Sequence, residues 1–281
     1  MEETKMKKII ALVMTTMMMV ACFCSCAAKP TADNSSKKGP VQPDPKVVTI
    51  GYTLYEPMNY LDKDGKLIGF DTELAEAVFE GMGYTPVFKL IDWGNKYVDL
   101  NSGTIDCVWN GFTANTKDDD GIARADKVDF SYNYMGNKQV IVAKKDTTIK
   151  TAADLSGKKG AAEKGSAGET YAKSLKGVTV QGVTYQTDAL MEVNSSTADF
   201  AVLDEQLAKS MCGKGNYTNL AIVVGIESDA EYYAIGFKKN SELTAKVNAE
   251  LEKLAANGTI TALAKKYGVE NTAIIDFADQ K

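Results

Sequence analysis

The sequence contains one arginine, Arg124, among its 32 lysines and arginines. Arginine differs from lysine in its planar fork of N–H donors, which binds a carboxylate through two parallel hydrogen bonds and stays charged at physiological pH. A chain that uses lysine for nearly every other cation and keeps one guanidinium raises the question of what needs a planar, always-charged fork at this position. One answer is an exposed salt bridge, in which arginine would contribute little to stability.

The rest of the composition argues against several classes of function. The chain has no histidine, so it carries neither a Ser-His-Asp or Cys-His catalytic set nor a His-ligated metal. Its net charge is −5 and its basic residues are scattered, which argues against nucleic acid as a partner. The acidic run KDDDG at 117–121 lacks the spacing of a calcium-binding EF-hand loop, so it is interpreted as a solvated turn. We expect no cofactor and no metal.

Residues 1–26 have the composition of an export signal. Lysines precede the apolar run at 9–21, which is followed by the segment CFCSC. The run is too short to be a comfortable membrane-spanning helix. A cysteine at the end of such a signal resembles a bacterial lipoprotein, in which that cysteine carries lipid. Cys26 is the candidate and Cys22 its rival, while a simple cleaved secretory signal is the alternative.

A tether is predicted between this signal and the folded domain. Residues 27–46 hold four of the six prolines and few apolar residues, which is typical of a disordered linker. The two remaining cysteines, Cys107 and Cys212, fall in distant parts of the fold that follows, so both are expected to be free thiols.

The rest of the sequence alternates predicted strands with predicted helices. Apolar, β-branched runs indicate strands, and apolar residues at helical spacing that end at glycine indicate helices. Strands are expected at 47–53, 87–92, 104–111, 138–145, 200–204 and 231–239, and helices at 69–84, 95–103, 241–258 and 259–268. This alternation predicts parallel α/β sheets, in which ligands bind at the carboxyl ends of the strands.

Five segments carry a more specific signal when they are taken in order. They are VVTIGYTLYEPMNYLDKDGKLIGFDTELAEAV, IDWGNKYVDLNSGTIDCVWNGFT, RADKVDFSYNYM, DLSGKKGAAEKGSAGE and LTAKVNAELEKLAANGTITALAKKYG. Together they resemble the solute-binding proteins of polar amino-acid ABC importers, the bacterial extracellular solute-binding family 3. The resemblance covers nearly all of the chain after the tether.

The resemblance implies an α/β protein with the two-lobed type II periplasmic-binding-protein fold. In that fold the ligand cleft lies between the lobes and two strands form the hinge. The resemblance places lobe 1 at 47–137 plus 237–281 and lobe 2 at 143–231, with hinge strands at about 138–143 and 232–237.

Arg124 matches the family's arginine before its Phe-Ser pair, which implies that it binds the α-carboxylate of an amino acid. The family has this arginine five residues after a threonine, whereas Thr113 and Arg124 are eleven apart. Two explanations are open. The extra loop at 114–123 bulges outward and leaves Arg124 in place, or the loop is remodelled so that Lys117 reaches the ligand.

Asp204 ends the apolar segment FAVLD, where the resemblance places the aspartate that binds the α-ammonium group. The alternative is an N-cap for the helix that follows, a role that aspartate often has. The resemblance adds donors from Asn110, Gly111 and Thr113 in lobe 1. In lobe 2 it adds donors from Ser166 and Ala167, which open a helix.

Aromatic and charged positions set the expected ligand side chain. Tyr55 and Trp93 match the aromatic residues that sandwich the ligand in the family, and a place in the hydrophobic core is the alternative for each. Tyr52 stands where many members carry an aspartate for basic ligands. A neutral polar or sulfur-containing amino acid is therefore favoured over a basic one, unless Glu163 supplies the missing charge.

The expected function is that of a monomeric, lipid-anchored protein outside the cell membrane or in the periplasm. It would capture a free amino acid between two closing lobes and deliver it to the permease subunits of an ABC importer. One alternative is a dehydratase of prephenate or arogenate type, with Glu163 or Asp204 as the general acid. The other is a sensory ligand-binding domain, which the lack of a later apolar run of membrane length disfavours.

Overall fold

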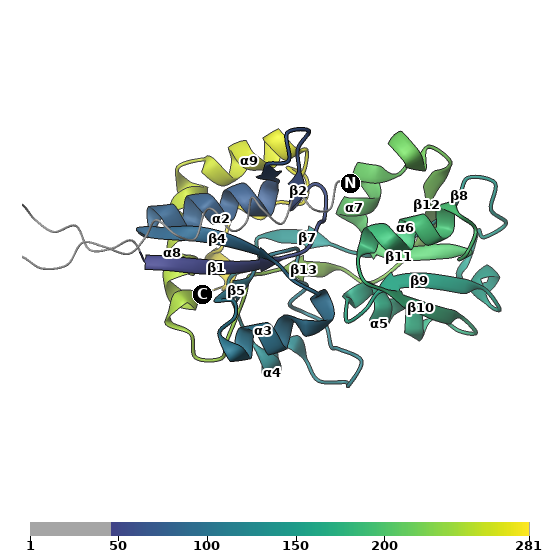
Figure 1. The fold of residues 1–281 in the computed structure, drawn as a ribbon, viewed down its shortest axis with the longest axis horizontal. Coiled ribbons are helices and arrows are strands. Elements are labelled where there is room, and N and C mark those ends of the chain that lie inside the picture. The colour runs from purple at the N-terminus through teal and green to yellow at the C-terminus, as the bar shows by residue number, and fades with distance from the viewer. Residues whose placement is uncertain (1–45, 281) are drawn as a thin grey trace, which may run out of the picture. The chain divides into compact units, whose positions relative to one another are not determined.

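The structure, a computed structural model, describes residues 46–280. The predicted export signal, Cys22, Cys26 and the tether up to residue 45 lie outside the described residues. The described residues belong to one compact unit that contains two five-stranded sheets (Figure 1). No helix in this part of the chain is long and apolar enough to cross a bilayer.

The first sheet has the strand order β4-β1-β5-β14-β6. Its strands are β1 (Lys46–Tyr52), β4 (Tyr84–Leu90), β5 (Cys107–Val108), β6 (Asp129–Phe130) and β14 (Gly236–Phe237). β1 runs parallel to β4 and β5, whereas β14 runs antiparallel to β5 and β6. The apolar side chains of Val48 and Ile50 in β1 are buried in the core, as expected for an inner strand of the sheet.

Helices cover both faces of the first sheet (Figure 1). On one face lie α2 (Phe70–Gly81), α8 (Glu242–Ala256) and α9 (Thr259–Tyr267), and on the other lie α3 (Lys96–Ser102) and α4 (Arg124–Lys127). α2 corresponds to the helix predicted at 69–84. It buries Leu74 and Val78, and its first turn carries acidic residues that the helix dipole favours.

The second sheet has the strand order β10-β9-β11-β8-β12. Its strands are β8 (Gln139–Lys144), β9 (Lys159–Glu163), β10 (Thr179–Val183), β11 (Phe200–Asp204) and β12 (Leu220–Glu227). α6 (Gln186–Asn194) and α7 (Glu205–Met211) share one hydrophobic cluster with this sheet. α5 (Ala167–Ser174) shares a second, separate cluster with the same sheet. Short 3-10 turns lie at Trp93–Asn95, Ala152–Leu155, Gly215–Tyr217 and Ala278–Gln280.

The predicted α/β fold is confirmed, with the difference that both sheets are mixed and each contains strands of both directions. β8 is antiparallel to both β11 and β12, and β14 is antiparallel to both of its neighbours. The register gives the reason. β8 begins at Gln139 opposite Asp204, where β11 ends, and β14 begins at Gly236 opposite Val108, where β5 ends. A strand that enters a sheet at the edge where the other strands end must run against them.

A short antiparallel ribbon precedes both of these strands. It pairs β7 (Met135–Asn137) with β13 (Glu231–Tyr233), and each partner leads within a few residues into the strand of a sheet. The predicted crossover at 138–143 lies mostly within β8, and the one at 232–237 covers the end of β13 and all of β14. A small hairpin of β2 (Tyr60–Leu61) and β3 (Leu67–Ile68) completes the strands. Cys107 and Cys212 are both free, as predicted.

Candidate functional site

Nine of the eleven predicted ligand-binding residues line a single cavity. The cavity is lined by Trp93, Asn110, Gly111, Thr113, Arg124, Glu163, Ser166, Ala167, Gln186 and Asp204. The first five follow strands of the first sheet, and the last five end strands or begin helices of the second. The cavity measures about 10 Å³, roughly the space of one water molecule. The two sheets are therefore closed around these side chains.

Arg124 is buried at the closed boundary, with 1% of its surface exposed. It opens α4, and its Nε donates to Asp118 Oδ1 at 2.8 Å. One terminal nitrogen donates to the carbonyl of Thr113 and the other to the carbonyl of Gly165, both at 3.2 Å. The guanidinium thus bridges the first and second sheets, and the interpretation as an exposed surface pair is wrong.

Asp118 fixes the guanidinium of Arg124 from its outer side. Its second oxygen accepts from Tyr97 Oη at 2.6 Å and from Lys127 Nζ at 2.8 Å. Burial acts to raise the pKa of Asp118, but the positive charge of Arg124 and the bonds from Lys127 and Tyr97 outweigh it and lower the pKa to about 2. Asp118 therefore stays ionised, and it leaves both terminal nitrogens of the fork directed toward the cavity boundary.

The extra loop at 114–123 supplies this aspartate. The loop turns back on itself through a bridge between Lys117 and Ala123, and Lys117 is exposed and does not line the cavity. Asp119 reaches α5 of the second sheet, where it contacts Lys173 and accepts from Thr170 at 3.1 Å. No group of acidic or cysteine side chains among residues 46–280 is arranged to hold a metal ion.

Asp204 lies at the carboxyl end of β11 and is buried. Its oxygens accept from the side-chain amides of Asn137 and Gln139, both at 2.6 Å, and of Gln186. It occupies the N-cap position of α7, but its side chain makes no capping hydrogen bond. Burial raises the pKa of Asp204, and the amide donors partly offset this effect. Its side chain is therefore directed toward the cavity instead of its own helix.

Glu231 is a buried carboxylate that the sequence analysis missed. Its Oε2 accepts from Gln139 at 2.8 Å and from Asn137 and Thr113 at 3.1 Å. Two amide side chains therefore bridge Glu231 and Asp204. Burial and the charge of Asp204 raise the pKa of Glu231 to about 7. Gln186, which lines the cavity, was missed as well, since isolated Glu and Gln residues in strands and helix starts carry no motif.

Glu163 ends β9, next to β11, and only 3% of its surface is exposed. Its Oε1 has no hydrogen-bond partner in the part of the chain that the structure describes. Burial and the nearby charge of Asp204 raise its pKa well above the usual range for a carboxyl group. Native structures rarely leave a buried carboxylate oxygen without a partner, so this group needs an explanation.

Lys96 is the second buried cation at the boundary between the sheets, and it was not predicted. Its Nζ donates to the carbonyl of Gly165 at 2.9 Å and to that of Trp93 at 3.3 Å, and it lies 4.9 Å from the centre of the Trp93 ring. Burial and the charge of Arg124 lower its pKa to about 7. Lys96 does not line the cavity. It contributes to closure through Gly165, the same residue that Arg124 contacts.

Asn110 and Gly111 line the cavity through a tightly held turn. The amide group of Asn110 donates to the carbonyl of Thr53 at 2.9 Å and accepts from its hydroxyl at 2.6 Å. The N–H of Gly111 donates to Asp71 Oδ2 at 2.8 Å. Gly111 has φ of 57°, and an added Cβ would lie 2.6 Å from Tyr55 Cε1. Only glycine therefore fits here without a shift of the ring.

The predicted aromatic residues lie in three different environments. Trp93 lines the cavity and meets Phe112 edge to face at 5.2 Å between ring centres. Tyr55 is buried beneath Gly111, with its hydroxyl 2.6 Å from that of Tyr233, and it does not line the cavity. Tyr52 packs edge to face on Phe88 at 6.1 Å and also lies outside the lining. Of these three aromatic residues, Trp93 alone is in a position to contact a ligand in this closed arrangement.

Ser166 and Ala167 bring the start of α5 to the cavity. Ser166 caps the helix, its hydroxyl accepting from the N–H of Glu169 at 3.0 Å. The N–H groups in the first turn of a helix have no intrahelical acceptor, and the helix dipole makes this end favourable for an anion. A carboxylate between Arg124 and this helix start would therefore meet donors from both sheets.

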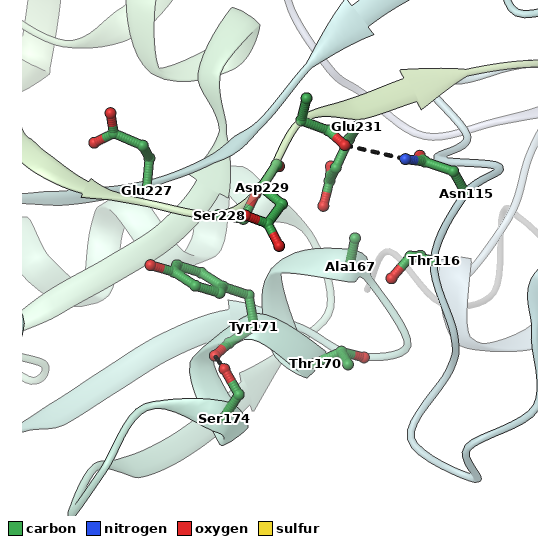
Figure 2. Close-up of a pocket in the computed structure, with 11 residues that line it drawn as sticks. Asn115, Thr116, Ala167, Thr170, Tyr171, Ser174, Glu227, Ser228, Asp229 and Glu231 are labelled. Atoms are coloured by element: carbon green, nitrogen blue, oxygen red, sulfur yellow. Dashed lines mark hydrogen bonds between the residues drawn. The ribbon is translucent and has the colours of Figure 1, made fainter.

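Figure 2 shows a larger cavity, of about 570 Å³, which shares Ala167 with the smaller one. It is lined by residues 115–116, by α5 and by residues 227–231, and Asn115 donates to the carbonyl of Ala230 across it at 3.0 Å. Every charged side chain that lines it is acidic. Of the two cavities, only the smaller has groups of both charges, so we assign the candidate site there and not to the larger one.

The fold and site match known solute-binding proteins. The family model of the bacterial extracellular solute-binding proteins, family 3, matches residues 48–270. The arginine-binding extracellular protein ArtP of Bacillus subtilis is 29% identical over 84% of this chain and 91% of its own length. The L-cystine-binding protein TcyA of the same organism is 29% identical over 95% of this chain and 99% of its own length.

Solved structures agree with this assignment. An ABC uptake transporter substrate-binding protein from Streptococcus pneumoniae with bound histidine has a TM-score of 0.72 and 33% identity, over 81% of this chain and 94% of that one. An ancestral arginine-binding protein bound to arginine has a TM-score of 0.72 and 32% identity, over 79% and 97%. The fold is thus that of the periplasmic binding proteins. The chain belongs to the bacterial extracellular solute-binding proteins, family 3, and is a transport component, not a dehydratase.

The first prediction concerns Asp71, which holds the Gly111 turn. Burial raises its pKa to about 7, although the Gly111 N–H and Tyr134 hydroxyl act to lower it. A carboxyl group whose folded pKa is raised stabilises the fold only while protonated, so this stability is lost as the pH rises from about 4 to about 7. We expect the free energy of unfolding to fall between pH 5 and 7, by at most about 1.4 kcal/mol per pH unit from this group.

Urea unfolding of Asp71→Asn at pH 5, 6, 7 and 8 tests this expectation. The variant should gain stability relative to the unmodified protein as the pH rises. Both proteins keep a residual slope of the same sign from Glu231, Glu163 and Asp204, whose pKa values are also raised. Asp146→Asn, which removes an exposed carboxylate, is the matched control and should follow the unmodified protein. A stability difference between Asp71→Asn and the unmodified protein that does not change with pH would contradict the assignment.

Proposed function

We propose that the protein captures a free polar amino acid between its two sheets and delivers it to the permease subunits of an ABC importer. The observation that carries the proposal is the convergence of Arg124 and Asp204 on one cavity, each from a different sheet. A zwitterion removed from water needs a matched partner for each of its charges, because an unpaired buried charge is costly.

Each end of the zwitterion has a partner of suitable geometry. The α-carboxylate would take the two terminal nitrogens of Arg124, which now contact the carbonyls of Thr113 and Gly165. It would also accept N–H donors from the start of α5. The α-ammonium group would donate to Asp204, in exchange for some of its present amide donors. Exchange of internal bonds for ligand bonds keeps these buried groups satisfied in both states.

Ligand access requires the two sheets to separate. The enclosed space is far smaller than an amino acid. Arg124 and Lys96 reach Gly165 across the boundary through side chains that would move with the first sheet. The ribbon of β7 and β13 is the natural hinge. We propose lobes at 47–137 plus 237–281 and at 143–231, with hinge strands near 138–143 and 232–237. The ligand stabilises the closed state because it contacts both lobes.

We also propose that the protein acts outside the cell membrane as a monomer held there by a lipid on Cys26. The support is the signal-like composition of residues 1–26 and the proline-rich stretch that follows. A tether of this kind leaves the folded domain free to open, close and reach a permease.

Thermal melting of the purified protein with each of the twenty amino acids and with cystine tests the binding function. A ligand at about 100 times its Kd stabilises by roughly 2.7 kcal/mol, which raises the melting temperature by several degrees. One or a few amino acids should give such a shift. No shift with any compound would contradict the proposal.

Arg124→Lys then tests the role of the guanidinium with the charge retained. Loss of the fork should weaken binding of the amino acid that gives the shift by about 1.5–3 kcal/mol, roughly tenfold to a hundredfold in Kd. The matched control is Lys117→Ala, which removes the exposed cation of the same loop and should leave Kd unchanged. Titration calorimetry gives both values. The account is wrong if Arg124→Lys binds normally, or if Lys117→Ala loses binding.

Cys26→Ser tests the lipid anchor in cells. The variant should lose incorporation of labelled palmitate and move from the membrane fraction to the soluble fraction. Cys24→Ser, two residues earlier in the same cluster, is the control and should remain lipidated. Retention of label in Cys26→Ser and its loss in Cys22→Ser would transfer the assignment to Cys22.

A further inference from the structure

The charges that line the site cavity are unequal in number. One cation, Arg124, and two carboxylates, Glu163 and Asp204, face it. The zwitterionic head of any amino acid uses one cation and one carboxylate, which in the proposed function are Arg124 and Asp204. Glu163 is then left over, buried and with one oxygen that has no hydrogen-bond partner among residues 46–280.

This extra carboxylate and Asp204 end neighbouring strands of the second sheet and line the same cavity. β9 and β11 are parallel neighbours, with Ala161 opposite Ala201. Glu163 ends β9 two residues after Ala161, Asp204 ends β11 three residues after Ala201, and both side chains line the cavity. Both carboxylates therefore emerge from the same edge of the second sheet, and each raises the free energy of ionising the other. A positive group between or beside them would relieve this repulsion.

The protein itself does not supply that positive group within salt-bridge distance. Lys96 is the nearest candidate, but its Nζ donates to two backbone carbonyls and forms no ion pair of 4 Å or less with Glu163. Arg124 is paired with Asp118. The other lining residues are neutral. Burial and the charge of Asp204 raise the pKa of Glu163 and favour its protonated form while the site is empty. A cationic group of the ligand beside Glu163 would favour the ionised form and give its unpartnered oxygen a partner.

We propose that the bound amino acid has a cationic side chain and that Glu163 selects it. This inference rests on the proposed function, and it names the class of amino acid as basic, of the arginine or lysine type. It takes up the exception that the sequence analysis left open for Glu163, because Tyr52 lies outside the cavity lining. The charge that Tyr52 lacks is supplied from the opposite sheet. A ligand with two zwitterionic heads, such as cystine, would need a second cation in the lining, which the cavity does not have.

Titration calorimetry with L-arginine and L-citrulline tests the proposal without any variant. The two differ in little besides the charge of the terminal group. The unmodified protein should bind arginine at least roughly tenfold tighter than citrulline, because a hydrogen bond to a charged group is stronger than one between neutral groups. Equal or tighter binding of citrulline, glutamine or cystine would overturn the proposal while leaving the amino-acid-binding function intact. Failure to bind any amino acid would overturn both.

Glu163→Gln tests whether this residue is the origin of the preference. The variant keeps the shape of the side chain and removes its charge, so the ratio of the two affinities should fall to about one, mainly through weaker arginine binding. Glu192→Gln is the matched control, because Glu192 also has a buried oxygen without a hydrogen-bond partner but does not line the cavity. Its ratio should equal that of the unmodified protein. An unchanged ratio in Glu163→Gln would show that another group selects the ligand.

Discussion

The buried guanidinium of Arg124 is the interaction on which the closed structure and the proposed site both depend. Asp118 holds its inner nitrogen, and its two terminal nitrogens contact a carbonyl from each sheet. A fork fixed on one side and shared between two lobes is suited to a ligand that bridges them, because a carboxylate can take over both terminal donors at once. Lysine, with a single charged nitrogen, could not hold all three acceptors in one plane.

The fold gives this fork its partners through the direction of its strands. β5, β9 and β11 end at the edges where the two sheets meet, and β8 and β14 begin there. Turns and helix starts that follow these strands therefore bring their polar groups to one boundary. This arrangement also buries several carboxylates that have few cations nearby. Amide side chains satisfy Asp204 and Glu231, whereas Glu163 keeps an oxygen without a partner.

Much of this arrangement could be predicted from the sequence, and the remainder follows from tertiary contacts that no local pattern encodes. The five motifs, taken in order, predicted the family, which the comparisons confirm. They also predicted Arg124, Asp204 and Trp93 as ligand-binding residues, and all three line the cavity. The antiparallel direction of β8 and β14 could not be predicted, since alternation with helices says nothing of strands that cross between lobes. Glu231 was missed because its neighbours in space are 92 and 94 residues away in sequence.

A crystal structure of the protein grown with L-arginine would test the central claim most directly. We predict the α-carboxylate on the terminal nitrogens of Arg124, the α-ammonium group at Asp204 and the ligand guanidinium within hydrogen-bond distance of Glu163. A ligand whose carboxylate lies away from Arg124, or whose side chain is directed away from Glu163, would contradict the account.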